Sequence, residues 1–161
     1  MNLQTKIEIP KSTWQISHTD RILLLGSCFA DEVGEKFLHS GFDAMVNPFG
    51  TLYNPASIAA QILRSINEES LSRNLSTEES GAAAELTFKD GSGTWHSWLH
   101  HSRFSAATLE ELVAKADATT MQVSEYLRTA DVLIVTLGTA IVYRLKENGM
   151  LVSNCHKQLD S

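Results

Sequence analysis

The sequence contains little cysteine, has fewer basic than acidic residues, and lacks any long apolar run. Its two cysteines, Cys28 and Cys155, are too few for a disulfide framework or a zinc site built from thiols alone. No apolar stretch approaches the roughly 18 residues of a membrane-spanning helix. Thirteen Lys and Arg against nineteen Asp and Glu give a net charge of −6, which disfavours nucleic acid and anionic membranes as partners. Residues 1–10 lack the apolar core of a secretory signal, so we expect a cytoplasmic protein.

The chain does contain enough apolar sequence for one folded domain. Of its 161 residues, 43% are hydrophobic and 20% are charged, which excludes a disordered polyelectrolyte. A chain of this length buries about two-thirds of its unfolded surface when it folds. We therefore expect a single domain over residues 1–161. The polar stretch 67–93 is expected to be a loop or an insertion, with a short strand near residues 86–88.

Two apolar runs predict the central strands of a sheet. Residues 22–25 and 132–135 are unbroken apolar segments, which are typical of parallel strands covered on both faces. After the first run, Phe29, Val33 and Phe37 recur at every fourth position, which predicts a helix. The two runs are separated by further helical sequence, and strands that alternate with helices indicate the α/β class.

Two more helices and a hairpin are predicted from the signals at their ends. Asn54 and Pro55 suit a helix cap and a first helical residue, and Thr108 begins a Thr-x-x-Glu capping box. Asn148 and Gly149, between two short apolar segments, predict a β-hairpin. Because only two strands look central and no helix follows the hairpin, we expect the chain to be the first part of a larger domain, incomplete at its C-terminus.

The turn after the first strand carries the strongest chemical signal. Gly26 allows a tight turn, and the unpaired N–H groups of the following helical turn can hold an oxyanion. A thiol at Cys28 is placed for nucleophilic attack, since the helix dipole favours its thiolate. Gly138, after the second strand, allows another loop to approach and offer an N–H group. The simpler alternatives are that Ser27 is only a helix cap, Cys28 a small buried residue and Gly138 an ordinary turn residue.

The aromatic and histidine-rich segment 95–104 has two interpretations. His96 and His100 would share one face of a helix, as zinc ligands do, but a third ligand and a general-base Glu are missing, so we expect no metal. The segment otherwise forms a lid or pocket wall, in which Arg103 can pair with a carboxylate or phosphate. It includes Trp95, Trp98, His100, His101, Arg103 and Phe104. The alternative is that the two tryptophans are plain core residues.

The segment Leu-Gly-Ser-Cys-Phe-Ala at 25–30 resembles the signature that names the GSCFA-domain family. Matching blocks follow in order at 47–55, 95–98, 100–104, 136–140, 142–143 and 154–157. The family is grouped with the SGNH (GDSL-like) hydrolases. The resemblance therefore implies a flavodoxin-like three-layer α/β/α sandwich with a mainly parallel sheet. It also implies a domain about twice as long as this chain.

The resemblance implies roles for the strand-end residues. In SGNH enzymes the third residue of a Gly-Asp-Ser block is the nucleophile, and the ungapped match places Cys28 there. Ser27 takes that place only with a shift of one residue, so both stay candidates. Gly50 resembles the oxyanion glycine of the second block. Gly138 and Thr139 occupy the third block, but the asparagine of that block is absent.

The histidine of the last SGNH block has no counterpart in the chain. The resemblance implies a base in downstream sequence, and His156 is the substitute within this chain. Other residues of the blocks are expected to line the pocket or to bind substrate: Phe29, Asn47, His96, His101 and Arg103. The expected function is hydrolysis or transfer of the acyl group of a small-molecule or carbohydrate ester, without a cofactor. The missing asparagine and histidine favour the alternative, a non-catalytic module that binds an anionic or carbohydrate ligand in the same pocket.

Overall fold

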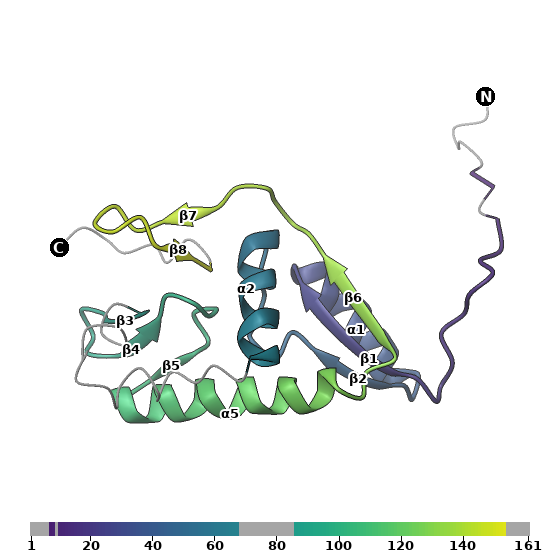
Figure 1. The fold of residues 1–161 in the computed structure, drawn as a ribbon, viewed down its shortest axis with the longest axis horizontal. Helices are drawn as coiled ribbons and strands as arrows, with labels where there is room; N and C mark the ends of the chain where they lie inside the picture. The colour runs from purple at the N-terminus through teal and green to yellow at the C-terminus, as the bar shows by residue number, and fades with distance from the viewer. Residues whose placement is uncertain (1–6, 9, 68–85, 154–161) are drawn as a thin grey trace.

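The centre of the fold is a parallel sheet of three strands (Figure 1). The computed structural model describes residues 7–8, 10–67 and 86–153. Strand β1 (Arg21–Gly26) lies between β2 (Asp43–Val46) and β6 (Val132–Thr136), and both neighbours run parallel to it. Helices connect these strands, so the chain has the predicted α/β class.

Strand β1 is buried on both faces, as its unbroken apolar run predicts. Ile22 and Leu24 pack against α1 (Cys28–His39). Leu23 and Leu25 face the other way and pack against α2 (Pro55–Ile66) and α5 (Leu109–Leu127). Because successive side chains of a strand alternate between faces, a strand between two helical layers needs an apolar residue at every position.

The helices begin where their cap signals predict. The hydroxyl of Ser27 accepts the N–H of Phe29 at 3.3 Å and caps α1. The side chain of Asn54 accepts the N–H of Ser57 at 2.8 Å and caps α2. Thr108 caps α5 in the same way. Each cap satisfies one of the N–H groups that the first helical turn leaves without a partner.

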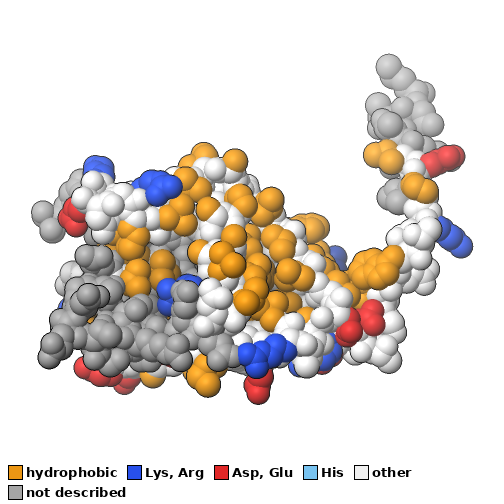
Figure 2. Space-filling view, in the orientation of Figure 1, with side chains coloured by type: hydrophobic (Ala, Val, Ile, Leu, Met, Phe, Trp, Pro, Cys, Tyr) orange, Lys and Arg blue, Asp and Glu red, His pale blue; other side chains and the backbone are white. Residues whose placement is uncertain are grey.

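The prediction that the second apolar run is covered on both faces is wrong. Leu133 and Val135 of β6 are 46% and 42% exposed. The register places them beside Leu23 and Leu25, on the face that α2 and α5 cover over β1. In the described part of the chain these helices do not extend over β6, and β6 pairs with β1 alone. Figure 2 shows hydrophobic side chains gathered in the middle of this side of the molecule.

Two small antiparallel sheets accompany the central one. Strands β3 (Thr87–Lys89), β4 (Trp95–Ser97) and β5 (Ser105–Ala106) form one of them, in which β4 and β5 contact α5, and β3 confirms the strand predicted near 86–88. Strands β7 (Tyr143–Arg144) and β8 (Leu151–Val152) form the predicted hairpin. Most of the expected 67–93 loop lies outside the described residues, as do Cys155 and His156.

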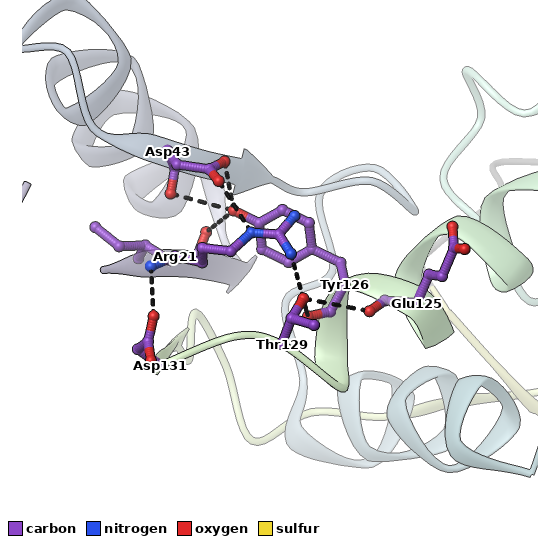
Figure 3. A network of polar contacts seen from close by, with 7 residues as sticks. Arg21, Asp43, Glu125, Tyr126, Thr129 and Asp131 are labelled. Carbon is purple, nitrogen blue, oxygen red and sulfur yellow. Dashed lines mark hydrogen bonds and ion pairs between the residues drawn. The ribbon is translucent and has the colours of Figure 1, made fainter. Parts of the chain in front are cut away.

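A polar network ties the sheet to α5 at the end where β1 begins (Figure 3). The guanidinium of Arg21 donates to the carboxylate of Asp43 at 2.9 Å and lies over the ring of Tyr126, 4.3 Å from its centroid. The backbone N–H of Arg21 donates to Asp131. The network therefore fixes the start of β1 against the start of β2 and the end of α5.

None of the described helices has the length and apolar character to cross a membrane.

Candidate functional site

The turn between β1 and α1 is shaped by Gly26. Its φ is +142°, a conformation that L residues rarely adopt. A Cβ at this position would overlap the carbonyl oxygen of Thr136 and lie 2.6 Å from its hydroxyl. The N–H of Ser27 donates to the same carbonyl at 3.0 Å. Glycine therefore lets the end of β1 close against the end of β6, directly before the helix begins.

The two candidate nucleophiles of this turn have different surroundings. Ser27 is 7% exposed, and its hydroxyl caps α1 while lying 3.1 Å from the hydroxyl of Thr136. Cys28 is the first residue of α1 and carries an exposed, free thiol. The interpretation of Ser27 as a helix cap is confirmed, whereas that of Cys28 as a buried small residue is wrong. The thiol, not the hydroxyl, is open to solvent.

Asn47 braces the turn from the end of β2. It is fully buried and is the one described non-glycine residue with a positive φ, 40°. Its side-chain oxygen accepts the N–H of Gly26 at 2.7 Å, and its amide group donates to the carbonyl of Ser27 and, at 2.8 Å, to Asp31. Both amide hydrogens are thus used by the protein itself. The side chain of Asn47 holds the turn in place, and the binding of substrate by Asn47 stays a prediction.

Asp31 is a site residue whose partners the sequence did not reveal. It lies in the first turn of α1 and accepts hydrogen bonds from Asn47 and from Thr51, the latter at 3.1 Å. Asp31 follows Cys28 by three residues, so the two share one face of the helix. The carboxylate of Asp31 contacts the 47–51 segment. Only the first-turn position of Asp31 was visible in the sequence, because its partners come from a loop of irregular backbone.

Gly50 brings a third segment to the site. Its φ is +83°, and a Cβ there would overlap the Cβ of His101 and lie 3.2 Å from Nε of Arg103. The N–H of His101 donates to the carbonyl of Phe49 at 3.4 Å, and the guanidinium Nη2 of Arg103 donates to the carbonyl of Asn47. The structure thus joins two of the expected substrate-binding residues, His101 and Arg103, to the strand-end turn.

The protonation state of His101 follows from its neighbours. Burial lowers the pKa of His101 from its ordinary value of 6.5, the charge of Arg103 lowers it further, and Asp31 acts in the opposite direction. The ring is therefore neutral at pH 7. Its Nδ1 accepts the backbone N–H of Arg103 at 3.2 Å, which leaves the proton of the neutral ring on Nε2. At neutral pH His101 is a hydrogen-bond donor through Nε2.

A family comparison covers all of these residues. The model of the GSCFA family matches residues 21–160. The chain belongs to the GSCFA family. Its signature turn at 26–30, the brace at Asn47 and the loop with Arg103 all lie within the match, so the site is built from family sequence. No curated protein and no solved structure matches the chain.

The two glycines expected to supply oxyanion N–H groups in this GSCFA domain have other partners. The N–H of Gly50 donates to the carbonyl of Asn47 at 2.8 Å, and the N–H groups of Gly138 and Thr139 both donate to the carbonyl of Tyr53. The predicted approach of the second strand-end loop is observed, since a Cβ on Gly138 would lie 3.1 Å from Cβ of Ser27. Its N–H group, however, is not available to a ligand.

Of the remaining expected site residues, Phe29 follows Cys28 in the first turn of α1, His96 lies in another sheet, and His156 lies outside the described residues. His96 is in β4, where its Nε2 lies 2.9 Å from the carboxylate of Asp90. The helix that would have paired His96 with His100 as metal ligands is replaced by β4 and a turn, and His100 is buried. The side chain of Phe29 is 64% exposed on α1. Among the residues that the structure describes, no three His, Cys, Asp or Glu side chains are grouped to hold a metal ion.

Proposed function

We propose that this GSCFA chain belongs to an SGNH-like hydrolase or acyltransferase in which Cys28 attacks the carbonyl carbon of an acyl ester. The observation that carries the proposal is the exposed Cys28 thiol at the first position of α1, directly after the central strand β1. In open α/β sheets, binding sites lie beyond the carboxyl ends of the strands. The helix N-terminus favours negative charge at this place. Helices on both sides of β1 agree with the three-layer α/β/α sandwich of that superfamily.

The proposed reaction has two steps. In the first, the sulfur of Cys28 forms a bond to the carbonyl carbon, the ester C–O bond breaks, and the alcohol leaves with a proton. In the second, water or an acceptor hydroxyl attacks the thioester, which releases the acid or a new ester and restores the thiol. A base takes the thiol proton in the first step and returns it to the departing alcohol. Because His101 carries its proton on Nε2 and its Nδ1 accepts a backbone N–H, this base is assigned to His156.

The oxyanion of the tetrahedral intermediate requires hydrogen-bond donors. The N–H groups of Gly50 and Gly138 are occupied by carbonyls, and those of Phe29 and Ala30 are occupied by Ser27, so the N–H of Cys28 at the start of α1 is the donor that we assign. One well-placed donor contributes on the order of 3 kcal/mol to transition-state stabilisation. Ser27 contributes by capping this turn, which supports Cys28 rather than Ser27 as the nucleophile.

The second candidate function is a non-catalytic module that binds an anionic or carbohydrate ligand. The occupied N–H groups of the two glycines favour it, because they leave fewer donors for an oxyanion than an acyl-transfer site requires. His101, as a donor rather than a base, suits ligand binding equally well. The two candidates differ in whether a covalent acyl-enzyme forms on Cys28.

Hydrolysis of 4-nitrophenyl acetate by the full chain tests the proposal. We expect release of 4-nitrophenolate, an acetyl adduct on the Cys28 peptide by mass spectrometry, and loss of both in Cys28→Ala. Ser27→Ala is expected to lower the rate without abolishing it. Cys155→Ala is the matched control for a thiol and is expected to behave as the wild type. Undiminished turnover in Cys28→Ala would reject the nucleophile, and the absence of any adduct on Cys28 would favour the binding module.

A further inference from the structure

Arg103 is a cation that the described structure fixes without neutralising it. The ion pairs among the described residues join Arg21 to Asp43 and His96 to Asp90, and neither includes Arg103. Its Nη2 instead donates to the backbone carbonyl of Asn47, a neutral acceptor. A guanidinium has five N–H donors in a planar fork that matches carboxylate and phosphate oxygens. One such contact positions the fork and leaves other donors for a ligand.

The fork is held close to the Cys28 turn by a single residue. The backbone carbonyl of Asn47 accepts Arg103, while the side chain of Asn47 binds Gly26 and Ser27, immediately before Cys28. Cys28 also shares a face of α1 with Asp31, which Asn47 contacts. Asn47 therefore links the Cys28 turn to the guanidinium of Arg103, through its side chain on one side and its carbonyl on the other.

The charges around the fork favour an anion. Lys115 donates from Nζ to the backbone carbonyl of Arg103 at 2.8 Å, which places a second cation at the backbone of this residue. Asp31 is the opposing charge, and both of its oxygens accept hydrogen bonds from Asn47 and Thr51. At His101 the charge of Arg103 has a larger effect on the pKa than the charge of Asp31. At His101 the positive charge of Arg103 therefore outweighs the negative charge of Asp31, although the chain as a whole carries a net charge of −6.

From this geometry we infer that Arg103 and the Nε2–H of His101 form an anion-binding subsite, separate from the donors that face the reacting carbonyl. The substrate then carries a carboxylate or phosphate beside that carbonyl. The inference rests on the proposed function for the role of Cys28. It narrows the substrate from acyl esters in general to anionic ones. Charge-assisted contacts of a guanidinium to an oxyanion are shorter and stronger than neutral hydrogen bonds, which gives the subsite its selectivity.

Alkylation of Cys28 tests the subsite without requiring turnover. Iodoacetate and iodoacetamide both react with a thiolate and release iodide, but only iodoacetate carries a carboxylate. We would measure the rate of alkylation by iodoacetate divided by the rate of alkylation by iodoacetamide, at the Cys28 peptide of the full chain, by mass spectrometry. Glutathione at the same ionic strength is the reference for this ratio. The fraction of thiolate cancels in the ratio. We expect the ratio at Cys28 to exceed that of glutathione several-fold.

Two variants and a matched control assign the effect to Arg103. Arg103→Gln is expected to reduce the ratio to the glutathione value, and Arg103→Lys, which keeps the charge, is expected to retain part of it. Arg144→Gln is the control, because the Nη1 of Arg144 is likewise bonded to one backbone carbonyl, that of Gly149, at 2.8 Å. Its ratio is expected to equal that of the wild type. A wild-type ratio equal to that of glutathione, or a ratio that Arg103→Gln leaves unchanged, would overturn the inference.

Competition separates the two ligand chemistries. Succinate and inorganic phosphate, each added at equal ionic strength, are expected to slow the iodoacetate reaction, and the more effective of the two identifies a carboxylate or a phosphate site. Failure of both to compete would count against the subsite. A raised ratio without hydrolysis of 4-nitrophenyl acetate would keep the subsite and reject acyl transfer. Hydrolysis of 4-nitrophenyl acetate by a chain whose alkylation ratio equals that of glutathione would keep acyl transfer and reject the subsite.

Discussion

The hydroxyl of Tyr126 donates a hydrogen bond to the carboxylate of Asp43 at 3.0 Å and so joins the last turn of α5 to the first residue of β2 (Figure 3). The same carboxylate accepts the guanidinium of Arg21 at its other oxygen. Tyr126 is only 7% exposed and lies in the core that α2 and α5 form against β1. One side chain thus combines apolar packing with a hydrogen bond to a charged partner.

Removal of this hydroxyl is expected to destabilise the fold. Tyr126→Phe keeps the ring and leaves Asp43 without one donor, so we expect the free energy of unfolding to fall by about 1–2 kcal/mol. Urea denaturation followed by circular dichroism measures it. Tyr143→Phe, at an exposed position of β7, is the control and is expected to change the value by less than about 0.5 kcal/mol. Equal effects of the two substitutions would contradict the structural role of the Tyr126 hydroxyl.

Tyr126 also makes the free energy of unfolding depend on pH in the alkaline range. Burial raises its pKa above the ordinary value of 10.0, and the hydrogen bond and charge of Asp43 raise it further, against the opposing effect of Arg21. As the pH rises, the unfolded chain therefore loses this proton before the folded chain does. The contribution is complete below about pH 10 and is lost as the pH rises through the folded pKa. Unfolding free energies between pH 9 and about pH 11.5 should fall more steeply for the wild type than for Tyr126→Phe, whereas parallel curves would refute the assignment.

Gly26 is expected to tolerate no side chain. Gly26→Ala places a Cβ on the backbone of Thr136 at a positive φ, so we expect a loss of several kcal/mol or a failure to fold. Gly91→Ala is the matched substitution, because a Cβ there meets no atom within 4 Å. Thermal unfolding of the two variants measures the difference. A Gly26→Ala protein as stable as Gly91→Ala would show that β1 and β6 need not approach as closely as described.

The elements with strong local signals were predictable from the sequence, including β1 and β6 of the central sheet, whereas β2 was not predicted. The cap at Asn54, the cap at Thr108 and the unbroken run of β1 each depend on residues close together in the chain. The exposure of Leu133 and Val135 was not predictable. An unbroken apolar run indicates that both faces of a strand can be buried. Whether a helix covers each face depends on the tertiary arrangement.

The candidate site likewise has one part that the local sequence predicts and another that depends on residues far apart in the chain. Its turn, with Gly26, Ser27 and Cys28, follows from the change of period between a strand and a helix. The occupied N–H group of Gly138 could not be foreseen, because its partner is the carbonyl of Tyr53, 85 residues earlier in the chain (138 − 53). Long-range backbone contacts of irregular loops carry no periodic signal.

Asn47 is expected to contribute strongly to stability. Asn47→Ala leaves the N–H of Gly26 and one oxygen of Asp31 without their donor or acceptor in a buried site, which costs about 2–3 kcal/mol of unfolding free energy. Asn148→Ala, in the exposed hairpin turn, is the control and is expected to cost less than about 1 kcal/mol. Chemical denaturation at pH 7 compares them. Similar losses would show that the amide of Asn47 does not brace the turn.

The position of His101 and Arg103 should depend on Gly50. Gly50→Ala places a Cβ on the side chain of His101 and displaces it, so we expect the iodoacetate preference of Cys28 to fall toward the glutathione value in a protein that remains folded. Gly93→Ala is the matched control, since Gly93 also has a positive φ, 89°, but a Cβ there meets only Lys89 at 3.7 Å. The alkylation ratio and the circular dichroism spectrum are measured together. An unchanged alkylation ratio in a folded Gly50→Ala protein would show that the subsite does not depend on the close approach of Gly50 to His101.

The buried amide of Asn47 has a consequence for how this protein can be altered. The side chain of Asn47 binds the turn that precedes Cys28, and its backbone carbonyl accepts the guanidinium of Arg103. We therefore expect a replacement of Asn47 to disturb both the proposed nucleophile and the proposed anion subsite. Substitutions meant to change one of these proposed properties at a time belong at positions 28 and 103, and a library designed to reshape this protein would leave position 47 constant.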